Sequence, residues 1–371
     1  MRNIAVFFGG RSNESEISII TGMLAVNLLR GADLQVYPVC LGEKGELFYK
    51  ADARGVEDFR DLSDKSIVCA ALEGNALVRA DKKRKKIATL DCALNCCHGG
   101  AGEDGTLSAL LSWNGLPFAS PEMPASAIFM NKEYSQIAAK GLGIPVAPSF
   151  SVREEAWRKD KSETLAKGEA LGYPLIVKPS TLGSSIGITV ARTETELKIA
   201  LDSAFRLDTG ALVEAYFEDK RDINCAAYSL RGETVTSECE EVFSAESILT
   251  FAEKYEGTGN TRNSRCPAEL PEEASQAIKG YTKLLYETFR LRGIVRADFL
   301  YAGGSVYFNE LNTVPGSLAC YLFGESLTEA RDLLVSVLQD RTKQREAQKL
   351  TLKTGILERD IFGGGKGCKK S

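Results

Sequence analysis

Hydrophobic and polar positions follow a strand period and then a helix period from the first residues onward. An apolar run, Asn3–Phe8, precedes Gly9-Gly10, and a helical pattern with one broad apolar face covers Ile17–Arg30. Leu34–Cys40 predicts the next strand. The opening apolar run is short and ends in two glycines, so it is expected to be a first strand and not a signal peptide. Strand, glycine turn and helix predict the start of a βαβ unit.

The next segment is less regular. Residues 42–91 have no sustained period and contain the basic run Lys82–Lys86, which predicts a solvated hairpin or loop in preference to a phosphate or nucleic-acid site. Ala93–Cys97 predicts a buried strand that leads into the glycine-rich stretch His98–Thr106 and a helix over Leu107–Trp113. His98 would lie at the carboxyl edge of its strand, where open α/β sheets bind ligands, although a lone histidine is more often structural.

A lysine followed by a glycine-serine loop stands in the middle of the chain. A helix is predicted over Ser126–Leu142, and Tyr173–Pro179 is a buried strand that carries Lys178. The loop Ser180–Ile188 leads to a short strand at Thr189-Val190. Backbone N–H groups and hydroxyls in such a loop can donate to phosphate oxygens while the lysine supplies charge. It is neither a Walker A motif nor a dinucleotide fingerprint, and a plain hairpin with a lysine is the alternative.

The following third contains one strand, one polar loop and one helix before a hairpin. Leu212–Phe217 is a short apolar strand, and Phe251–Arg265 is a polar segment with the character of a mobile loop. Helices are predicted over Pro271–Arg290 and Ser326–Gln339. The tail beyond Arg341 is basic and glycine-rich, so it is expected to be peripheral.

The stretch Ile294–Pro315 reads as two apolar strands around Ala302-Gly303-Gly304, which is a hairpin signal. If the turn is centred on Gly304, Asp298 lies opposite Glu310, and Arg296 lies opposite Asn312. Two carboxylates directly opposite each other destabilise a sheet unless a cation lies between them. Oxygen ligands of this kind suit Mg²⁺, which takes few carboxylates and completes its shell with phosphates and water. A surface hairpin with scattered charges is the alternative.

Composition narrows the class of protein. With 371 residues, 44% hydrophobic and 26% charged, the chain is long enough for two or three globular domains. A net charge of −4 gives no reason to expect nucleic acid or an anionic membrane as partner. No apolar run is long enough to span a bilayer. Ten cysteines without a CxxC pair, together with one histidine, argue against zinc and favour reduced thiols in a cytoplasmic protein.

Four motifs occur in one order: a glycine turn with Glu14 and Ser18, HGxxGEDGT from His98, the Lys178 strand with its GSSxG loop, and the hairpin R-x-D…E-x-N-T-x-P-G. In the order of these four motifs the chain resembles the D-alanine–D-alanine ligases of the ATP-grasp superfamily, and the resemblance covers residues 1–340. The resemblance implies an α/β (α+β) fold of ATP-grasp architecture. It implies an N-terminal Rossmann-like βαβ domain at 1–120 that binds substrate, ATP-grasp subdomains at 121–211 and 212–340, and a peripheral tail at 341–371.

The resemblance also implies roles for residues that match the family's motifs. Expected catalytic residues are Glu14, Ser184, Lys254, Tyr255, Arg296 and Gly316. Expected substrate contacts are Ser18, His98, Tyr321 and Leu322. ATP is expected at Lys132, Lys178, Ser184, Ser185, Glu214, Ala215, Phe217, Asp222, Asn309 and Glu310, and the magnesium ligands at Asp298, Glu310 and Asn312.

The implied activity is ATP-dependent ligation of two D-alanines through an acyl phosphate, which supplies peptidoglycan precursors. Two Mg²⁺ ions, with Mn²⁺ as a substitute, a cytoplasmic location and a homodimer follow from the same likeness. At Tyr321 the family commonly has a serine that grips the second D-alanine's carboxylate; a tyrosine is bulkier but can donate one hydrogen bond. A different acceptor (D-serine, D-lactate or another amino acid) is therefore one alternative. A non-catalytic ATP-binding regulator on the same fold is a separate one.

Overall fold

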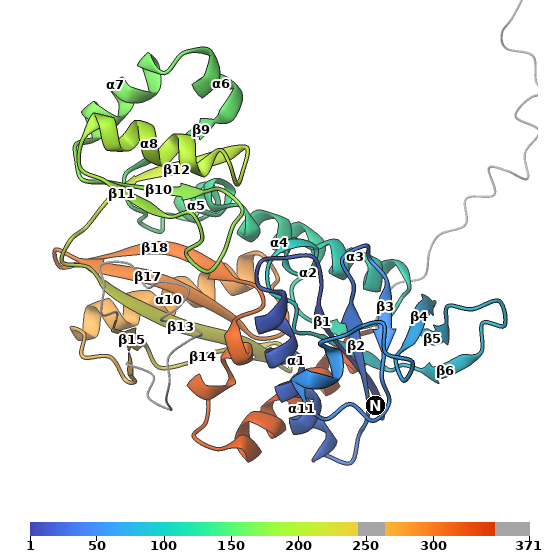
Figure 1. The fold of residues 1–371 in the computed structure, drawn as a ribbon. Coiled ribbons are helices and arrows are strands. Elements are labelled where there is room, and N and C mark those ends of the chain that lie inside the picture. The colour runs from blue at the N-terminus through green and yellow to red at the C-terminus, as the bar shows by residue number, and fades with distance from the viewer. Residues whose placement is uncertain (244–263, 346–371) are drawn as a thin grey trace, which may run out of the picture.

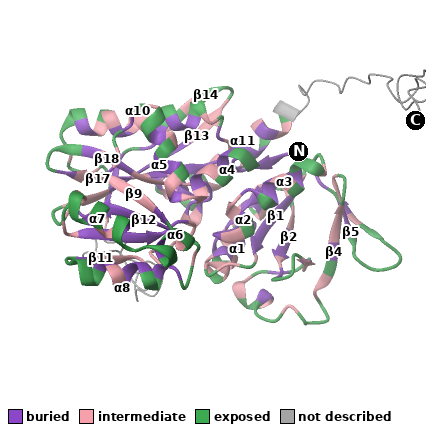
Figure 2. Ribbon diagram, turned by 90° about the horizontal axis from the view of Figure 1, so that it is seen from above, coloured by how far each residue is buried: buried purple, intermediate pink, exposed green. Residues whose placement is uncertain are grey.

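A computed structural model describes residues 1–243 and 264–345, with side chains to residue 343. Three β-sheets with helices on their faces make up this part of the chain (Figure 1). The strands are mostly buried, whereas exposed residues concentrate on the outer helices and on the hairpins at one end of the first sheet (Figure 2). The predicted class, a mixed α/β protein that opens with a βαβ unit, is what the structure shows.

The first sheet has eight strands in the order β6-β5-β4-β3-β2-β1-β7-β8. Its parallel part is β1 (Asn3–Gly9), β2 (Gln35–Leu41), β7 (Cys92–Asn95) and β8 (Phe118–Ala119). Helices α1 (Ser15–Arg30), α2 (Gly100–Glu103) and α3 (Thr106–Trp113) follow the strands β1 and β7. The helix α11 (Leu327–Arg345) returns from the far end of the chain and contacts α1, β7 and β8.

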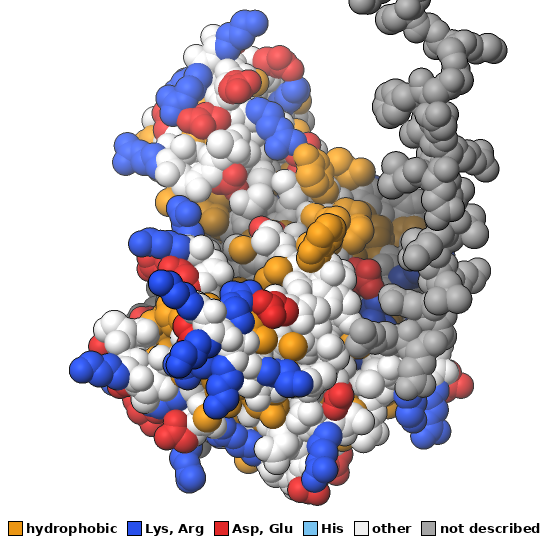
Figure 3. Space-filling view, turned by 90° about the vertical axis from the view of Figure 1, so that its right-hand side faces the viewer, with side chains coloured by type: hydrophobic (Ala, Val, Ile, Leu, Met, Phe, Trp, Pro, Cys, Tyr) orange, Lys and Arg blue, Asp and Glu red, His pale blue; other side chains and the backbone are white. Residues whose placement is uncertain are grey.

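Residues 42–91, where a solvated hairpin or loop was predicted, form more regular structure than a loop. They form β3 (Leu47–Tyr49), β4 (Val68–Glu73), β5 (Ala76–Arg79) and β6 (Lys86–Thr89), with the turn η1 (Val56–Phe59). Each strand pairs antiparallel with its neighbour, beginning at the edge of β2. These strands are too short to show a period, and the existing sheet edge supplies the hydrogen bonds that order them. The basic run is exposed at the β5–β6 hairpin as predicted, and Figure 3 shows Lys and Arg side chains gathered among acidic ones on this side of the molecule.

Two helices lead from the first sheet to the second. They are α4 (Met123–Met130) and α5 (Lys132–Gly141), where a single helix over 126–142 was predicted. Asn131 breaks the pattern because it adopts an extended backbone and its side-chain oxygen accepts from the Tyr134 N–H at 3.2 Å. An asparagine at this position is a favourable N-cap, so a new helix begins at Lys132.

The second sheet is antiparallel, with the order β11-β10-β12-β9. It comprises β9 (Ser149–Arg153), β10 (Leu175–Pro179), β11 (Thr189–Ala191) and β12 (Gly210–Ala215). The helices α6 (Glu154–Lys159), α7 (Ser162–Leu171) and α8 (Glu194–Ala204) cover its outer face (Figure 1). Trp157 and Leu201 are fully buried between these helices and the sheet. The inner face of the sheet is left for the cavity described below.

The third sheet follows the order β16-β15-β13-β17-β18, and β14 pairs with β13. Its strands are β13 (Arg221–Leu230), β14 (Glu233–Thr236), β15 (Glu240–Val242), β16 (Ser264–Arg265), β17 (Val295–Ala302) and β18 (Ser305–Asn312). The helix α10 (Glu272–Thr288) packs on one face of this sheet. On that face the rings of Phe299 and Phe308 pack edge to face, with their centroids 5.8 Å apart. The short turn η2 (Gly316–Leu322) leads from β18 to α11.

The predicted pairing across the β17–β18 hairpin is confirmed, since Asp298 lies opposite Glu310 and Arg296 opposite Asn312. The turn consists of Gly303 and Gly304, which both have positive φ. In a regular hairpin with this two-residue turn, Asp298 would pair with Asn309. A bulge between Asp298 and Phe299 leaves Asn309 without a partner and moves the register by one residue. Both Asn309 and Glu310 consequently line the cavity, although they are adjacent in sequence.

The domain boundaries stay predictions. Strand β12 crosses the expected boundary at 211/212 and pairs with β9 and β10, so its residues belong to the second sheet. The part of the chain that the structure describes contains no helix long and apolar enough to cross a membrane.

Candidate active site

One cavity of about 640 Å³ lies between the second and third sheets and reaches the loops that follow β1 and β7. Most of the residues predicted to be functional line it: Glu14, His98, Lys132, Lys178, Ser184, Ser185, Glu214, Ala215, Phe217, Asp222, Arg296, Asp298, Asn309, Glu310, Asn312, Gly316 and Tyr321. Lys254 and Tyr255 fall outside the described residues. Residues far apart in sequence are thus brought to one space, which is the expected property of a binding site.

Lys178 and Glu214 form a buried ion pair on neighbouring strands β10 and β12. Lys178 is 7% exposed and Glu214 is 2% exposed. The Lys178 ammonium also donates to the Asn309 side chain at 2.8 Å, which joins the second sheet to the bulge of the third. A buried charge needs such partners because desolvation is otherwise costly. Lys178 is therefore held in place with its charge directed into the cavity.

Lys132 occupies the first position of α5 and links the glycine-serine loop to the hairpin. Its ammonium donates to the Leu182 carbonyl at 2.5 Å and lies 3.7 Å from the Glu310 carboxylate. Asn131 caps this helix, so the new helix start that sequence reasoning did not predict is also what fixes the position of Lys132. Two ammonium groups from different elements are thereby directed into one cavity.

The glycine-serine loop meets Glu14 from the first sheet. The Ser184 hydroxyl donates to the Glu14 carboxylate. A Cβ on Gly183 would lie 2.7 Å from a Glu14 carboxylate oxygen, and one on Gly99 would lie 2.8 Å from it. A side chain at either position would force the Glu14 carboxylate to move, and Gly99 also has φ of +64°, which favours glycine. The loop itself is turned by Ser184 and Ser185, both of which have positive φ. Glu14 is consequently enclosed by two glycine-containing loops.

Arg296, Asp298 and Asn312 form one hydrogen-bonded group on the hairpin. The Arg296 guanidinium donates to both oxygens of Asp298 at 2.7 and 2.8 Å, and the Asn312 amide donates to Asp298 at 2.9 Å. Burial by itself would lower the pKa of Arg296, but the adjacent Asp298 carboxylate outweighs it and raises that pKa well above its ordinary value. Arg296 is therefore a permanent cation at the cavity wall.

The residues on this hairpin fit a magnesium ion by the chemistry of their donors. Asp298 and Glu310 are paired across the strands and both line the cavity, with the Asn312 amide beside them. Within residues 1–243 and 264–345 no group of three or more His, Cys, Asp or Glu side chains could hold a metal ion. Two carboxylates with one amide are a suitable set for Mg²⁺, which draws its remaining ligands from substrate phosphates and water.

A largely apolar region of the cavity borders these charges. Its walls include Phe129, Met130, Ile176, Phe217 and Leu300. The rings of Phe217 and Tyr307 stack with centroids 4.9 Å apart, which fixes the plane of Phe217. Asp222 lines the same cavity and pairs with Lys220. An apolar space next to polar groups suits a nucleotide base and its sugar.

His98 lies at the cavity wall with its ring nearly buried. Its Nε2 is 2.8 Å from the Thr21 hydroxyl on α1. Burial lowers the pKa of His98, and the Glu14 carboxylate opposes this effect only in part. Glu103, four residues after Gly99, accepts from the N–H groups of Gly99 and Val314 at 3.0 and 3.2 Å, and burial raises its pKa. The glycine-rich stretch is thus tied to the end of the hairpin.

Two residues predicted to contact substrate do not line the cavity. Ser18 is fully buried on α1, where its hydroxyl accepts from the Gly9 N–H at 2.7 Å and donates to the Cys96 carbonyl at 3.0 Å. Leu322 is 8% exposed and packs in the core that α1 and α11 share. Ser18 therefore fixes the glycine turn, and Leu322 anchors η2.

Past Gly316 the backbone adopts an unusual conformation. Ser317, Leu318 and Ala319 have φ of 50°, 53° and 48°, which is the left-handed region for three residues in succession. Such a turn costs roughly 1–2 kcal/mol per residue and persists only where its surroundings enforce it. Leu318 and Ala319 are buried, and the turn brings Tyr321 to the cavity.

Sequence reasoning missed residues behind the cavity wall and residues on it. Gln136 is buried behind the wall, where it donates to Glu214 and accepts from the Ser149 hydroxyl at 2.6 Å. It lies four residues after Lys132, so the helical period could have placed both on one face of α5. Glu240 and Asn224 also line the cavity, and only the pairing of β13 with β15 brings them there.

Comparison with known proteins gives a single family. The "D-ala D-ala ligase N-terminus" profile matches residues 3–121, and the "D-ala D-ala ligase C-terminus" profile matches residues 138–339. A D-alanine--D-alanine ligase of Helicobacter pylori (strain P12) is 32% identical over 90% of this chain and 93% of its own length.

Solved structures agree with this assignment. The D-alanine–D-alanine ligase structure from Helicobacter pylori superposes with a TM-score of 0.75 at 28% identity, covering 92% of this chain and 99% of that one. A D-Ala:D-Ser ligase from Enterococcus faecalis superposes with a TM-score of 0.76 at 25% identity, covering 91% and 99%. These matches confirm the predicted ATP-grasp architecture, and the chain belongs to the D-alanine–D-alanine ligase family.

Proposed function

We propose that this protein joins two molecules of D-alanine, with conversion of ATP to ADP and phosphate, and supplies the dipeptide for peptidoglycan synthesis. One observation carries the proposal. A single cavity is lined by Glu14 with Ser184, by the ammonium groups of Lys132 and Lys178, and by the carboxylates of the β17–β18 hairpin. A carboxylate–amine ligase needs all three: a group for the substrate ammonium, cations for phosphate, and ligands for a metal.

The first D-alanine would bind at Glu14. A carboxylate enclosed by Gly99 and Gly183 suits an ammonium group, and the Ser184 hydroxyl orients that carboxylate. In this pose the substrate's own carboxylate points to the phosphate-binding region. Tyr255, a proposed partner of Glu14, and Lys254, proposed to reach the γ-phosphate, lie outside the described residues.

In the first step an oxygen of the D-alanine carboxylate attacks the γ-phosphorus, and the bond to ADP breaks with its electron pair on ADP. Carboxylate and phosphate repel each other, so Lys132 and Lys178 serve to hold them together by neutralising charge. Ser184 and Ser185 offer hydroxyl and N–H donors to phosphate oxygens. Asp298, Glu310 and Asn312 would hold Mg²⁺, which when bound offsets the charge of the phosphates.

In the second step the neutral amine of the second D-alanine attacks the acyl carbon, the bond to phosphate breaks with its electron pair on phosphate, and the proton that the amine loses can pass to the leaving phosphate. The oxyanion that forms needs donors already in place, and Arg296 and the Gly316 N–H line the same cavity. A single donor of this kind is typically worth about 2.7–4 kcal/mol. Because Nε and Nη2 of the guanidinium both donate to Asp298, Arg296 is oriented before substrate binds.

The remaining features of the proposal come from the family. Mg²⁺, with Mn²⁺ as a substitute, a cytoplasmic location and a homodimer are proposed on that ground. D-Alanine and ATP are the proposed small-molecule partners, and nucleic acid and membrane are not proposed as partners.

The test is ADP release by the purified chain with Mg²⁺-ATP, measured with D-alanine, D-serine, D-lactate or no acceptor, with the product identified by mass spectrometry. We expect ADP release that depends on D-alanine and a D-alanyl-D-alanine product. The variant Asp298→Asn should lose at least about a hundredfold in kcat. Turnover with D-serine or D-lactate but not with D-alanine would reject this choice of substrate.

A further inference from the structure

One carboxylate at the cavity ties together two segments that are far apart in the chain. Glu103 ends the short helix α2, and its Oε2 accepts from the Gly99 N–H at 3.0 Å. Its Oε1 accepts from the Val314 N–H, 211 positions away, at 3.2 Å and from the Thr313 hydroxyl at 3.4 Å. Glu103 therefore bridges the loop that follows β7 and the segment that follows β18.

Each end of this bridge lies next to a group that has a role in the proposed reaction. On one side Gly99 lies against Glu14, the proposed partner of the first substrate's ammonium group, since a Cβ on Gly99 would be 2.8 Å from a Glu14 carboxylate oxygen. On the other side Gly316, the proposed oxyanion donor, follows Val314 by two residues. The bridge thus connects the pocket of the first D-alanine with a donor that acts in the second step.

The helix that carries Glu103 is itself fixed against the end of β7. The Asn95 side chain is 2% exposed, donates to the Gly102 carbonyl at 2.8 Å and accepts from the Cys97 N–H at 2.9 Å. A Cβ on Gly102 would lie 2.1 Å from the Cys97 Cβ, so α2 packs more closely here than a side chain would allow. A group locked in this way by packing and hydrogen bonds can hold its own partners in a defined position.

The segment after β18 is held by its side chains and, separately, by Glu103. Thr313 and Val314 are 2% and 3% exposed, and Val314 packs in the core that α1 and α11 share. A buried N–H that loses its acceptor is costly, so without Glu103 the backbone at Val314 would shift while its side chain stays anchored. A shift of about 1 Å at a group near the chemistry can cost about a hundredfold in rate.

We propose that Glu103 is a positioning residue for the second step, in which it keeps the Gly316 N–H at the place where the oxyanion of the first D-alanine forms. This inference rests on the proposed function. It assigns the effect of Glu103 to the second step, because the ammonium groups used in the first step are held by other contacts. Lys132 donates to the Leu182 carbonyl, and Lys178 donates to Asn309.

The variant Glu103→Gln tests the bridge, since it keeps the size of the side chain. One acceptor oxygen becomes an NH₂ group, which cannot accept from the Gly99 or the Val314 N–H. With enzyme in excess over Mg²⁺-ATP, rapid chemical quench follows the two steps separately, because ADP reports the first step and dipeptide the second. We expect dipeptide formation to slow about 10- to 100-fold and ADP formation to stay within threefold of the parent rate.

A second variant removes one contact of the bridge and leaves the carboxylate in place. Thr313→Val loses only the hydrogen bond of 3.4 Å, so it should slow dipeptide formation less than Glu103→Gln does, again with little change in ADP formation. It also serves as the test if Glu103→Gln does not fold. Equal slowing of both steps would indicate a merely structural role and overturn the inference, as would an unchanged rate of dipeptide formation.

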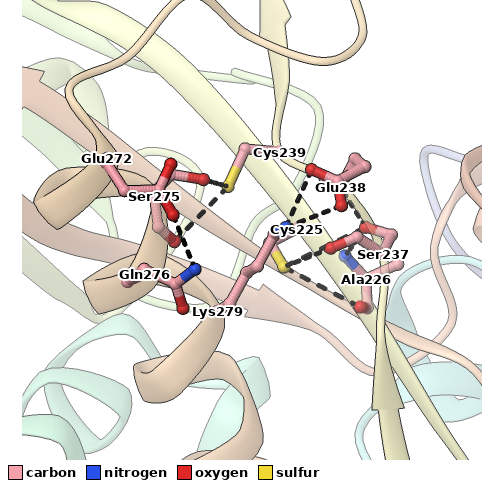
Figure 4. A network of polar contacts seen from close by, with 9 residues as sticks. All are labelled: Cys225, Ala226, Ser237, Glu238, Cys239, Glu272, Ser275, Gln276 and Lys279. Atoms are coloured by element: carbon pink, nitrogen blue, oxygen red, sulfur yellow. Dashed lines mark hydrogen bonds and ion pairs between the residues drawn. The ribbon is translucent and has the colours of Figure 1, made fainter.

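The matched control is Glu238→Gln, which changes a carboxylate that also ties two elements together. Figure 4 shows Glu238, on the segment before β15, paired with Lys279 of α10, which donates to both of its oxygens at 2.7 and 2.8 Å. Neither residue of this pair lines the cavity. Glu238→Gln should therefore leave the rates of both steps within twofold of the parent rates.

Hydrogen exchange of backbone amides examines the bridge without turnover. Peptides that cover residues 96–102 and 312–318 should both exchange at least tenfold faster in Glu103→Gln than in the parent protein, because the two segments lose a shared acceptor. That result supports the bridge even if the parent enzyme makes no D-alanyl-D-alanine, in which case the proposed function alone fails. Unchanged exchange in the 312–318 peptide overturns the inference even if dipeptide forms.

Discussion

The buried pair of Lys178 and Glu214 allows folding and catalysis to be separated by mutation. In Lys178→Met the Glu214 carboxylate stays 2% exposed and loses its counter-ion. Breaking a buried ion pair by removal of one partner costs about 3–5 kcal/mol. Gln136 still donates to Glu214, so the loss should lie near the lower value. At roughly 2 °C per kcal/mol for a chain of this size, Tm should fall by about 6 °C.

The double variant Lys178→Met with Glu214→Gln leaves no buried charge at this position. Replacement of both members of a buried pair is often neutral, so Tm should return to within about 2 °C of the parent. Turnover should not return, because the phosphate-binding ammonium is still missing. A loss of about 10²- to 10³-fold in kcat is expected in both variants, the typical worth of one such electrostatic contact.

Thermal unfolding by circular dichroism and ADP release by a coupled assay measure the two effects. Lys198→Met, which breaks the exposed pair with Glu194 on α8, is the control and should change neither quantity measurably. A Lys178→Met protein that melts at the parent temperature would refute the reasoning on burial. Recovery of turnover in the double variant would refute the phosphate role of Lys178.

Three other perturbations follow from the site. Removal of divalent metal with EDTA should abolish ADP release, and Mg²⁺ or Mn²⁺ should restore it; turnover that persists in EDTA would reject the proposed metal ligands. Gly183→Ala places a Cβ 2.7 Å from a Glu14 carboxylate oxygen and should raise the KM of the first D-alanine at least tenfold, without changing the KM of ATP. Burial lowers the pKa of His98, so the unfolded chain takes up the proton first as the pH falls. The free energy of unfolding should therefore decrease below about pH 6.5. His98→Gln should flatten that slope between about pH 7.5 and 5.5, and parallel Tm curves would contradict it.

The β17–β18 hairpin shows both the strength and the limit of pattern reasoning. Alternation around two glycines predicted the hairpin, and the facing pairs Asp298–Glu310 and Arg296–Asn312 are confirmed. The way in which this register arises differs from the prediction. The turn consists of Gly303 and Gly304, and the bulge at Asn309 then shifts the pairing by one residue. The facing pairs are therefore the same as those of a turn centred on Gly304. The sequence carries no local signal for that bulge, which also directs Asn309 to Lys178.

Residues 42–91 and the break at Asn131 were predicted less well for a related reason. The strands β3 to β6 are only three to six residues long, and their order comes from the edge of β2 and not from their own periodicity. Asn131 lies between two helical patterns whose phases nearly match, so only its extended backbone reveals the break. In both cases neighbouring structure outweighs local propensity.

By itself the sequence determined the order of elements, the glycine turns and the residue types for a phosphate and metal site. These features depend on local hydrophobic periods and on the residues that favour turns, both of which can be read from short stretches of sequence. The tertiary structure alone decided that Glu240 meets Tyr321, 81 positions away, and that Ser18 and Leu322 stay inside. Sheet pairing is non-local, and a shift of one residue turns a side chain from cavity to core. Which of these side chains line the cavity is therefore known only from the paired strands.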